Sequence, residues 1–567
     1  MTKEPAGTVH PPVGSAVLLD DPGDDSVVRP IKGTGRNAEE DQAESPTLAF
    51  RYASVPQAAP MTAAPYPGRQ ARRRSRMRVF LPLTAVTTAA LLLVTVTGAT
   101  PAAADRNPDG TPLVKVSHGD PYAKCTIGAR SPDSIVYPAT EVEPYLSVDP
   151  RDPKRVVTVF QQDRWNDGGA RGLAAGWTTD GRTFHRSTLP FSLCAPGGAD
   201  YERASDPWVS TGPDGTVYAG GEGVDFTKST RSALLAVTSR DGGRTWRNLT
   251  TTHVDEQPFF NDKPSLTADP IRKGTAYQVW NRLDNDPPGP GSLDGPGYIS
   301  LTRDGGRTWS KARPFVDTSG VPNTQTIGHL IVADRRTGTL YDFFDRITYA
   351  DDLSTVVEAR YQVVTSTDAG DTWSAPVTVA RDTSVPEVDP NDPATPLRAA
   401  ATLPSPAVDP KTGTLYMAYE GSDFSGGKFD SVQLVRSTDG GHTWGTPELI
   451  SPKGVPAFSP SIAVAERGTV ALTYYDLRFL KPDNTTTLPT AYQLATLRHG
   501  NPRLRTERRI SRIFDWLQAP FAGGYFLGDY QGLVADGKGV RAVLTETHSG
   551  APQNRTDVYT SSLRTPR

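Results

Sequence analysis

The chain has 567 residues and a formal net charge of -3, with 60 Lys and Arg against 63 Asp and Glu. Without a basic excess to neutralise phosphates, this balance argues against a nucleic-acid partner. Gly and Pro are frequent, at 52 and 51 residues, and only 8% of residues are aromatic. The composition is typical of a soluble protein rich in turns.

The first 104 residues differ from the rest. Residues 1–76 are polar, rich in Pro and Ala and without hydrophobic periodicity, so we expect a disordered leader. Five arginines between positions 72 and 78 precede an uncharged stretch, 79–104, which ends in three alanines. This order predicts an export signal peptide over residues 77–104. The alternative is a membrane anchor, because ~20 apolar residues span a bilayer.

A leader of this length is unusual before a signal peptide. Met61 or Met77 is therefore a candidate for the true start, with the upstream residues a mis-called start. The alternative is a signal anchor with a disordered cytoplasmic tail. In either case we expect the globular part, 105–567, to lie outside the cell, secreted or anchored at its surface.

Cysteine is rare and is confined to the exported part. The only two, Cys125 and Cys194, both follow the export segment. In an oxidising compartment such a pair is most simply a disulfide, with two free buried thiols as the alternative. The disulfide would tie the N-terminal segment to the end of the first repeat.

Internal repetition is the strongest signal in the sequence. Four stretches, at 239–246, 302–309, 366–373 and 437–444, fit the pattern S/T-x-D-x-G-x-T-W, and a shortened copy spans 178–184. The closing aromatic residues are 62, 63, 64 and 71 residues apart. Such near-constant spacing indicates a repeat architecture.

The motif is typical of a hairpin turn that is stabilised by side-chain hydrogen bonds. Its Gly permits the positive φ of a tight turn, and its Asp and Ser/Thr can bond turn N–H groups. Its Trp is expected to pack between neighbouring sheets. We therefore assign a structural role to its carboxylates: Asp180, Asp241, Asp304, Asp368 and Asp439.

Two further strand-like runs precede each motif. The first run begins at positions 144, 207, 264, 329, 404, 460 and 531, and the second is aromatic and β-branched. With the two hairpin strands, each unit has four short strands, as in a propeller blade. We predict an all-β propeller with seven blades, or alternatively six. The last blade lacks an outer strand, which residues 112–117 of the N-terminal strand would supply, closing the ring.

The repeated motif and the four-strand unit resemble the sialidase superfamily, also called the BNR or Asp-box repeat family, and in particular exported actinobacterial-type members. The likeness covers about residues 112–565. It implies a glycosidase-like site with three arginines on a sugar carboxylate, a Tyr–Glu nucleophile pair and an Asp acid/base. The chain has no Arg-Ile-Pro motif in its first blade, which is the usual marker of the first of those arginines.

Candidate site residues lie in loops that leave the second strand or enter the first, on the face opposite the motif turns. Asp/Arg pairs recur there in several blades, which suits a polar, carbohydrate ligand; the alternative for each residue is an inter-blade ion pair. Trp165, Trp208, Trp280 and Tyr530 offer stacking surfaces, with a core role as the alternative. The expected substrate-binding residues are Asp163, Arg164, Arg282, Asp345, Arg346, Asp476 and Arg478.

For hydrolysis, the acid/base candidates are Asp206, Asp262 and Asp529, because a pair of carboxyl groups suffices. Arg282, Arg346 and Arg478 are the candidate clamp. Tyr530 is the nucleophile candidate for a sialoside, with Glu546 as its partner.

The sequence thus favours an exported sialidase-like glycoside hydrolase acting on terminal sugars. The alternative is a non-catalytic propeller that binds glycans or protein at the cell surface. No organic cofactor is expected. Acidic loops offer oxygen ligands suited to Ca²⁺, although no EF-hand run occurs and the metal stays open. Membrane contact is expected only through residues 79–104, and the oligomeric state is left open.

Overall fold

The computed structural model describes residues 105–106 and 112–565, except 286, 288, 400, 499–500, 502–504, 538 and 549–550. The predicted leader and the signal peptide or anchor over residues 1–104 lie outside the described residues. The described part is all-β, apart from two short 3-10 helices, η1 (Asp423–Ser425) and η3 (Trp516–Gln518). None of its helices is long and apolar enough to cross a bilayer.

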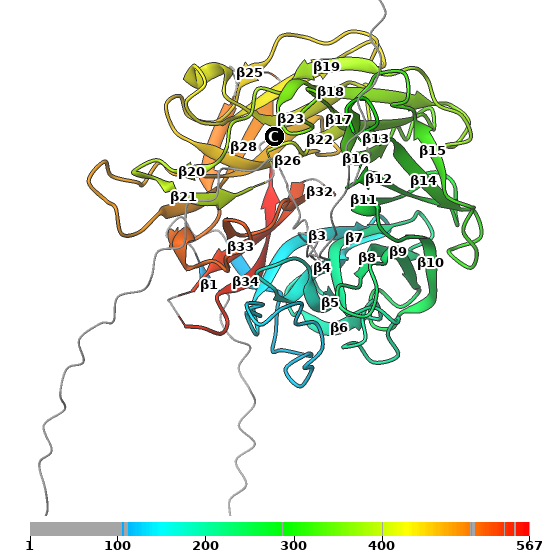
Figure 1. Cartoon of the computed structure of the whole chain (residues 1–567). Helices are drawn as coiled ribbons and strands as arrows, with labels where there is room; N and C mark the ends of the chain where they lie inside the picture. Colours follow the sequence, from blue (N-terminus) through cyan, green and yellow to red (C-terminus); the bar gives the residue numbers. More distant parts are fainter. Residues whose placement is uncertain are drawn as a thin grey trace, which may run out of the picture. The chain divides into compact units, whose positions relative to one another are not determined.

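Most strands belong to four-stranded antiparallel units that follow one another along the chain (Figure 1). The first two units are joined into one eight-stranded sheet by a single pairing, Ala170 with Ala204. We number these units 1 to 7 within the described residues. Unit 1 contains β3 (Glu141–Asp149), β4 (Asp152–Arg164), β5 (Ala170–Thr178) and β6 (His185–Leu189). Unit 2 contains β7 (Arg203–Thr211), β8 (Val217–Val224), β9 (Ser232–Ser239) and β10 (Arg247–Asp255). Unit 3 contains β11 (Phe259–Ala268), β12 (Ala276–Asp284), β14 (Gly297–Thr302) and β15 (Arg313–Val316).

The other units repeat this order. Unit 4 contains β16 (Thr324–Ala333), β17 (Leu340–Tyr349), β18 (Val356–Ser366) and β19 (Val377–Arg381). Unit 5 contains β22 (Ser405–Val408), β23 (Leu415–Gly421), β24 (Ser431–Ser437) and β25 (Glu448–Leu449). Unit 6 contains β26 (Ala457–Val464), β27 (Thr469–Asp476), β28 (Pro489–Arg498) and β29 (Arg505–Arg509). Unit 7 contains β32 (Gly532–Asp536), β33 (Gly539–Thr547), β34 (Thr556–Arg564) and, from the N-terminal side, β2 (Pro112–Lys115).

Unit 7 joins the two ends of the described chain. Val114 of β2 lies opposite Thr560 of β34, the pairing expected for residues 112–117. The first strand of each unit, which we call its innermost strand, contacts the first strand of the next unit. The first strand of unit 7, β32, contacts β3 of unit 1. In Figure 1 the red strands of unit 7 accordingly lie beside the cyan strands of unit 1.

Short strands outside the units connect or extend them. A segment between units 4 and 5, which we call the insertion (residues 382–403), carries two of these strands and pairs in parallel with β31. The short strands are β1 (Asp105–Arg106), β13 (Asp294–Gly295), β20 (Val388–Asp389), β21 (Asp392–Arg398), β30 (Phe514–Asp515) and β31 (Tyr525–Phe526).

The apolar core is divided among the interfaces between neighbouring units. One cluster combines Val159 and Leu173 of unit 1 with Val209 and Leu235 of unit 2, and another combines units 5 and 6. Each sheet therefore buries its faces against its neighbours. The ring of Trp246 packs against the first of these clusters, and its indole N–H donates to Ser187 of unit 1 at 3.1 Å.

The five motif turns share one hydrogen-bond pattern. Asp241 Oδ1 accepts from the backbone N–H of Thr245 at 3.0 Å and from the hydroxyl of Ser239 at 2.8 Å. Asp304, Asp368 and Asp439 make the same two bonds, and in the shortened copy Asp180 bonds Thr183 and Thr178. These carboxylates therefore hold turns. The predicted disulfide between Cys125 and Cys194 is present, with Cα atoms 5.5 Å apart.

Candidate functional site

A β-bulge recurs at the same place in the innermost strand of five units. At each bulge the register shifts and one residue takes a positive φ, between 49° and 74°. In four of the five, a proline follows, which has no N–H to give to the ladder and is tolerated at bulges. The bulge residues are Glu143, Asp206, Lys263, Gly328 and Ser459.

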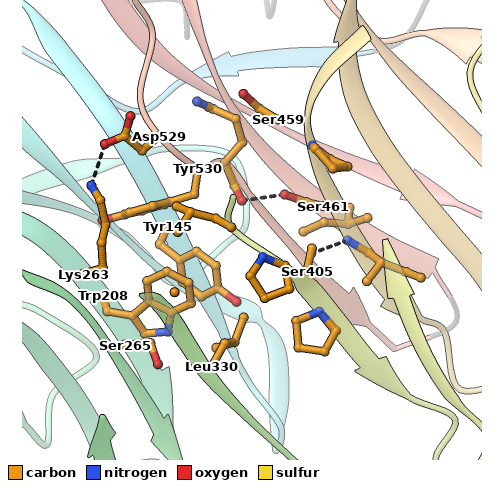
Figure 2. Close-up of a pocket in the computed structure, with 18 of the residues that line it drawn as sticks. Tyr145, Trp208, Lys263, Ser265, Leu330, Ser405, Ser459, Ser461, Asp529 and Tyr530 are labelled. Atoms are coloured by element: carbon orange, nitrogen blue, oxygen red, sulfur yellow. Dashed lines mark hydrogen bonds and ion pairs between the residues drawn. The ribbon is translucent and has the colours of Figure 1, made fainter. Parts of the chain in front are cut away.

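The ammonium group of Lys263 lies among three carboxyl groups, two of which belong to bulge residues. Lys263 Nζ lies 2.5 Å from Asp529 Oδ2, 3.3 Å from Asp206 Oδ2 and 3.8 Å from Glu143 Oε1. All four residues are at most 6% exposed. Figure 2 shows Lys263 and Asp529 facing each other at one side of a pocket. We call Glu143, Asp206, Lys263 and Asp529 the lysine-centred cluster.

Two arginines complete the charge balance of this cluster. Arg398, from β21 of the insertion, donates from Nε and Nη2 to the two oxygens of Asp529 at 2.9 and 2.5 Å. Its guanidinium lies 4.4 Å from the centre of the Phe526 ring, and that of Arg164 lies 4.7 Å from the same ring. The Arg398 side chain remains 25% exposed and is the member that reaches solvent.

The cluster shifts the pKa values of two neighbouring carboxyl groups in opposite directions. Burial, reinforced by the charge of Asp206, raises the pKa of Glu143 to about 8. Burial alone would also raise the pKa of Asp529, but Arg398 and Lys263 hold that pKa well below its ordinary value of 3.8. At neutral pH, Glu143 is therefore protonated and Asp529 is ionised. Environments that push two carboxyl groups apart in this way assign acid and base roles.

An aromatic wall stands beside the cluster. The rings of Tyr145 and Trp208 stack with centroids 3.7 Å apart, and Tyr530 meets Trp208 edge-on at 5.1 Å. The Tyr530 hydroxyl donates to the Pro207 carbonyl at 2.9 Å. These rings and Asp529 line a cavity of about 70 Å³ among the innermost strands. At ~30 Å³ per water, such a volume holds water rather than a whole sugar ring.

Several predicted site residues therefore come together. Asp206, Asp529, Tyr530 and Arg164 lie in or against the lysine-centred cluster. Asp262 is adjacent, since its carboxylate accepts from the backbone N–H of Lys263 at 2.9 Å.

The predicted arginine clamp is not assembled. Arg282 is bonded to Asp255 at 2.8 and 3.1 Å, and Arg478 pairs with Asp476 and Glu507. Arg346 lies in β17 beside Asp345, a fully buried carboxyl group whose pKa is raised by burial and by Asp382. Among the described contacts none joins the three arginines, and Arg282 and Arg478 are each paired with nearby carboxylates instead.

Two further expected arrangements also differ. Tyr530 and Glu546 do not form a pair: Glu546 accepts from the backbone N–H and Nε of Arg512 at 2.9 and 2.8 Å, and no described hydrogen bond joins it to Tyr530. Burial raises the pKa of Tyr530 far above 10, so the phenolate is disfavoured. Asp163 is buried and bonded to Arg171 at 3.1 Å.

Of the four proposed stacking residues, two are buried in the core and two line the cavity. Trp280 is fully buried, and its indole N–H donates to Asn261 at 2.8 Å, so it belongs to the core. Trp165 is buried under the guanidinium of Arg203, 4.6 Å from the ring centre. Trp208 and Tyr530 are the two that line the central cavity.

Sequence reasoning missed Glu143, Lys263 and Arg398. The first two occupy the same repeat position as Asp206, directly before the proline that opens the first-strand run, so aligning the repeats on that proline would have found them. Arg398 belongs to the insertion, which lengthens the last motif spacing to 71 residues. That excess length was the available signal.

One group of carboxylates beside the cluster has metal-ligand spacing. Asp206, Glu222 and Asp262 each offer an oxygen within 4.8 Å of the others. Lys263 lies 3.3 Å from Asp206 and already brings a positive charge to this group. A second, more open hollow of about 610 Å³ lies over Arg512, Phe514, Asp515 and His548. Its volume falls within the range of ligand pockets.

Comparisons with solved structures return matches at low identity. No family model matches the chain, and no curated protein does. A Dyadobacter fermentans protein of unknown function is 14% identical, with a TM-score of 0.43, covering 76% of this chain and 98% of its own. Penicillium chrysogenum α-L-arabinanase, solved with arabinobiose, is 12% identical, with a TM-score of 0.42 and coverages of 76% and 97%. A Hadza microbial sialidase is 15% identical, with a TM-score of 0.41 and coverages of 72% and 76%.

Proposed function

We propose that the chain is a glycoside hydrolase that removes terminal sugars, with its reacting groups in the lysine-centred cluster. The observation that carries the proposal is the pair of carboxyl groups on Lys263 with opposite pKa shifts, Glu143 raised and Asp529 lowered. A glycosidase needs such a pair, one group to give a proton and one to act as an anion.

In this proposal Glu143 protonates the leaving-group oxygen, and the Asp529 carboxylate attacks or stabilises the sugar carbon that loses it. Both contact the same Nζ, so the pair is closer to the ~5 Å separation of retaining enzymes than to the wider inverting arrangement. The substrate is bound by Arg398 and Arg164, at the side of the cluster where the Arg398 side chain is exposed.

The architecture belongs to the same proposal. We infer that units 1 to 7 form a seven-bladed propeller closed by β2, which is supported by the contacts between successive innermost strands and between β32 and β3. The cluster then lies where units 1, 2 and 3 meet the C-terminal segment. The disulfide supports a site of action outside the cell, secreted or at the surface.

The experiment is hydrolysis of a panel of fluorogenic hexosides, pentosides and a sialoside by the full chain. We expect release of one sugar, and a loss of ~10³-fold in kcat for Glu143→Gln and for Asp529→Asn, the size of general acid–base catalysis. Activity should fall above pH 8, where Glu143 loses its proton. Asp439→Asn, in a motif turn, is the matched control and should retain activity.

The alternative is a non-catalytic carbohydrate-binding protein, which is favoured by the mutual pairing of the cluster charges and the small central cavity. A folded chain that releases no sugar, but is retained by immobilised glycans, would replace the hydrolase with this function.

A further inference from the structure

A second group of buried carboxylates lies between the insertion and unit 5. Glu387 of the insertion, Glu420 at the end of β23 and Asp430 before β24 each place one carboxylate oxygen within 4.8 Å of the others. Glu420 and Asp430 are each 1% exposed, and Glu387 is partly exposed. We call these three residues the acidic cluster.

The acidic cluster has unused acceptors. Glu420 Oε1 accepts from the backbone N–H of Ser459 at 2.8 Å, but its Oε2 is buried without a hydrogen-bond partner. Oε1 of Glu387 is also buried and unpartnered. A buried anionic oxygen without a partner is costly, so these atoms point to a ligand that supplies positive charge.

No described Lys, Arg or His forms an ion pair with the acidic cluster. The base that acts on Glu387 is Arg398, but its Nε and Nη2 already bond Asp529. Asp382 and Asp423 lie close enough to add further negative charge. The region thus gathers carboxylates that no protein cation neutralises.

We propose that the acidic cluster binds a calcium ion. The ligands are oxygens only, and Ca²⁺ takes 6–8 oxygens at 2.3–2.6 Å in variable geometry, so oxygens on opposite sides of the ion are about 5 Å apart. Mg²⁺ requires a tighter octahedron and usually keeps several waters with only one or two carboxylates, so a group of three protein carboxylates suits it less well.

The ion would fix the insertion against unit 5. The backbone carbonyl of Glu387 accepts from the N–H of Leu397 at 2.9 Å, and Leu397 directly precedes Arg398 in β21. Calcium would therefore hold the strand that delivers Arg398 to Asp529. This inference goes beyond the proposed function, and its test does not depend on catalysis.

The test is thermal unfolding and titration calorimetry of the full chain after removal of metals with EDTA. We expect saturating CaCl₂ to raise the Tm by ~3 °C or more, because an ion that binds only the folded state stabilises it. Equal MgCl₂ should raise the Tm less. Tb³⁺ should show luminescence sensitised through Tyr361, which lies near Glu420 and Asp430.

The variants Glu420→Gln, Asp430→Asn and Glu387→Gln should each lose the calcium response. The far-ultraviolet circular dichroism of each variant should match that of the parent, which separates loss of the ion from unfolding. The matched control is Glu222→Gln, since Glu222 occupies in β8 the position of Glu420 in β23, and this variant should keep the response.

Absence of any calcium shift and of calorimetric binding in the folded, metal-free parent would overturn the proposal. So would a response that survives in all three variants, or one that disappears with Glu222→Gln alone. Hydrolysis is not read in these measurements, so a failed calcium site and a failed glycosidase remain distinguishable.

Discussion

The lysine-centred cluster and the acidic cluster are built at equivalent places with opposite electrostatics. Glu222 is the sixth residue of β8 in unit 2, and Glu420 is the sixth residue of β23 in unit 5. Each faces the bulge of the following unit, where unit 3 offers Lys263 and unit 6 offers Ser459. The two bulge residues have nearly the same backbone, with φ values of 50° and 49°.

At this equivalent position the two sites differ in the bulge side chain, and the acidic cluster also includes Glu387 of the insertion. With Lys263 the surrounding carboxylates find an internal counter-charge, and Asp529 is ionised. With Ser459 the backbone N–H satisfies one oxygen of Glu420 and leaves the other unpartnered. One repeat position thus decides whether a buried acidic group is balanced by the protein or by a ligand.

Lys263→Ser is the change with the largest expected effect. It leaves Glu143, Asp206 and Asp529 buried without their shared ammonium, and breaking a buried ion pair costs ~3–5 kcal/mol. Urea unfolding of parent and variant measures this loss. The matched control is Lys228→Ser, on the partly exposed pair with Asp200, which should cost less than ~1 kcal/mol.

The double variant Lys263→Ser with Asp206→Asn sharpens this result, because Asp206 lies 3.3 Å from the ammonium group. If the loss arises from uncompensated charge, removing one carboxylate should recover part of it, as a coupling energy in a double-mutant cycle. Additive losses would contradict the charge balance that distinguishes the two clusters.

The pH dependence of stability tests Glu143 directly. Its folded-state pKa of about 8 exceeds the ordinary 4.5, so between these values the folded state holds a proton that the unfolded state has released. Stability should therefore fall as pH rises from 4.5 to 8, by up to about 5 kcal/mol, and level off above. Asp529 acts in a separate, acidic window, because a lowered pKa loses its stabilisation only as pH falls below 3.8.

Glu143→Gln removes that slope, because glutamine keeps the neutral form at every pH. Urea unfolding between pH 5 and 8.5 should give a flatter curve for the variant, while Asp439→Asn should follow the parent. Parallel parent and Glu143→Gln curves would rule out Glu143 as the titrating group. The groups that face Glu143 are Gln161, Asp206, Lys263, Asp529 and Arg164.

Local pattern was enough for the strands and for part of the site. The constant motif spacing predicted four-stranded units, and the two cysteines predicted their own disulfide. Part of the site was predicted because the loops that enter the first strand and leave the second strand of each unit lie on the same face. These loops gave Arg164, Asp206 and Asp529. The hydrogen-bond partners of the site residues were not predicted, because a long arginine side chain can reach several neighbours. Arg282, for example, pairs with Asp255 of the preceding unit.

The missed residues have physical reasons. Glu143 and Lys263 lie at bulges, where the extra residue breaks the period-2 alternation that assigns side chains to a face. Arg398 reaches Asp529 because β21 pairs in parallel with β31, more than a hundred residues later in the chain. Such a long-range pairing leaves no trace in local sequence. The hydrogen bonding of Glu420 likewise depends on Ser459 in the next unit, which satisfies only one of its two oxygens.

Ser459→Lys is the smallest expected change and tests the comparison most directly. Lys263 shows that lysine adopts this bulge conformation before proline, so the variant transplants the counter-charge of unit 3 into unit 6. In EDTA its stability should rise by ~1 kcal/mol, since buried carboxylates gain an internal cation. The calcium response should disappear, because the ammonium would occupy the place of the ion. Ser459→Ala, which keeps the backbone N–H to Glu420, should leave the calcium response intact. If Ser459→Lys still binds calcium with the parent affinity, the two clusters do not differ by that one side chain, and the ion is held elsewhere.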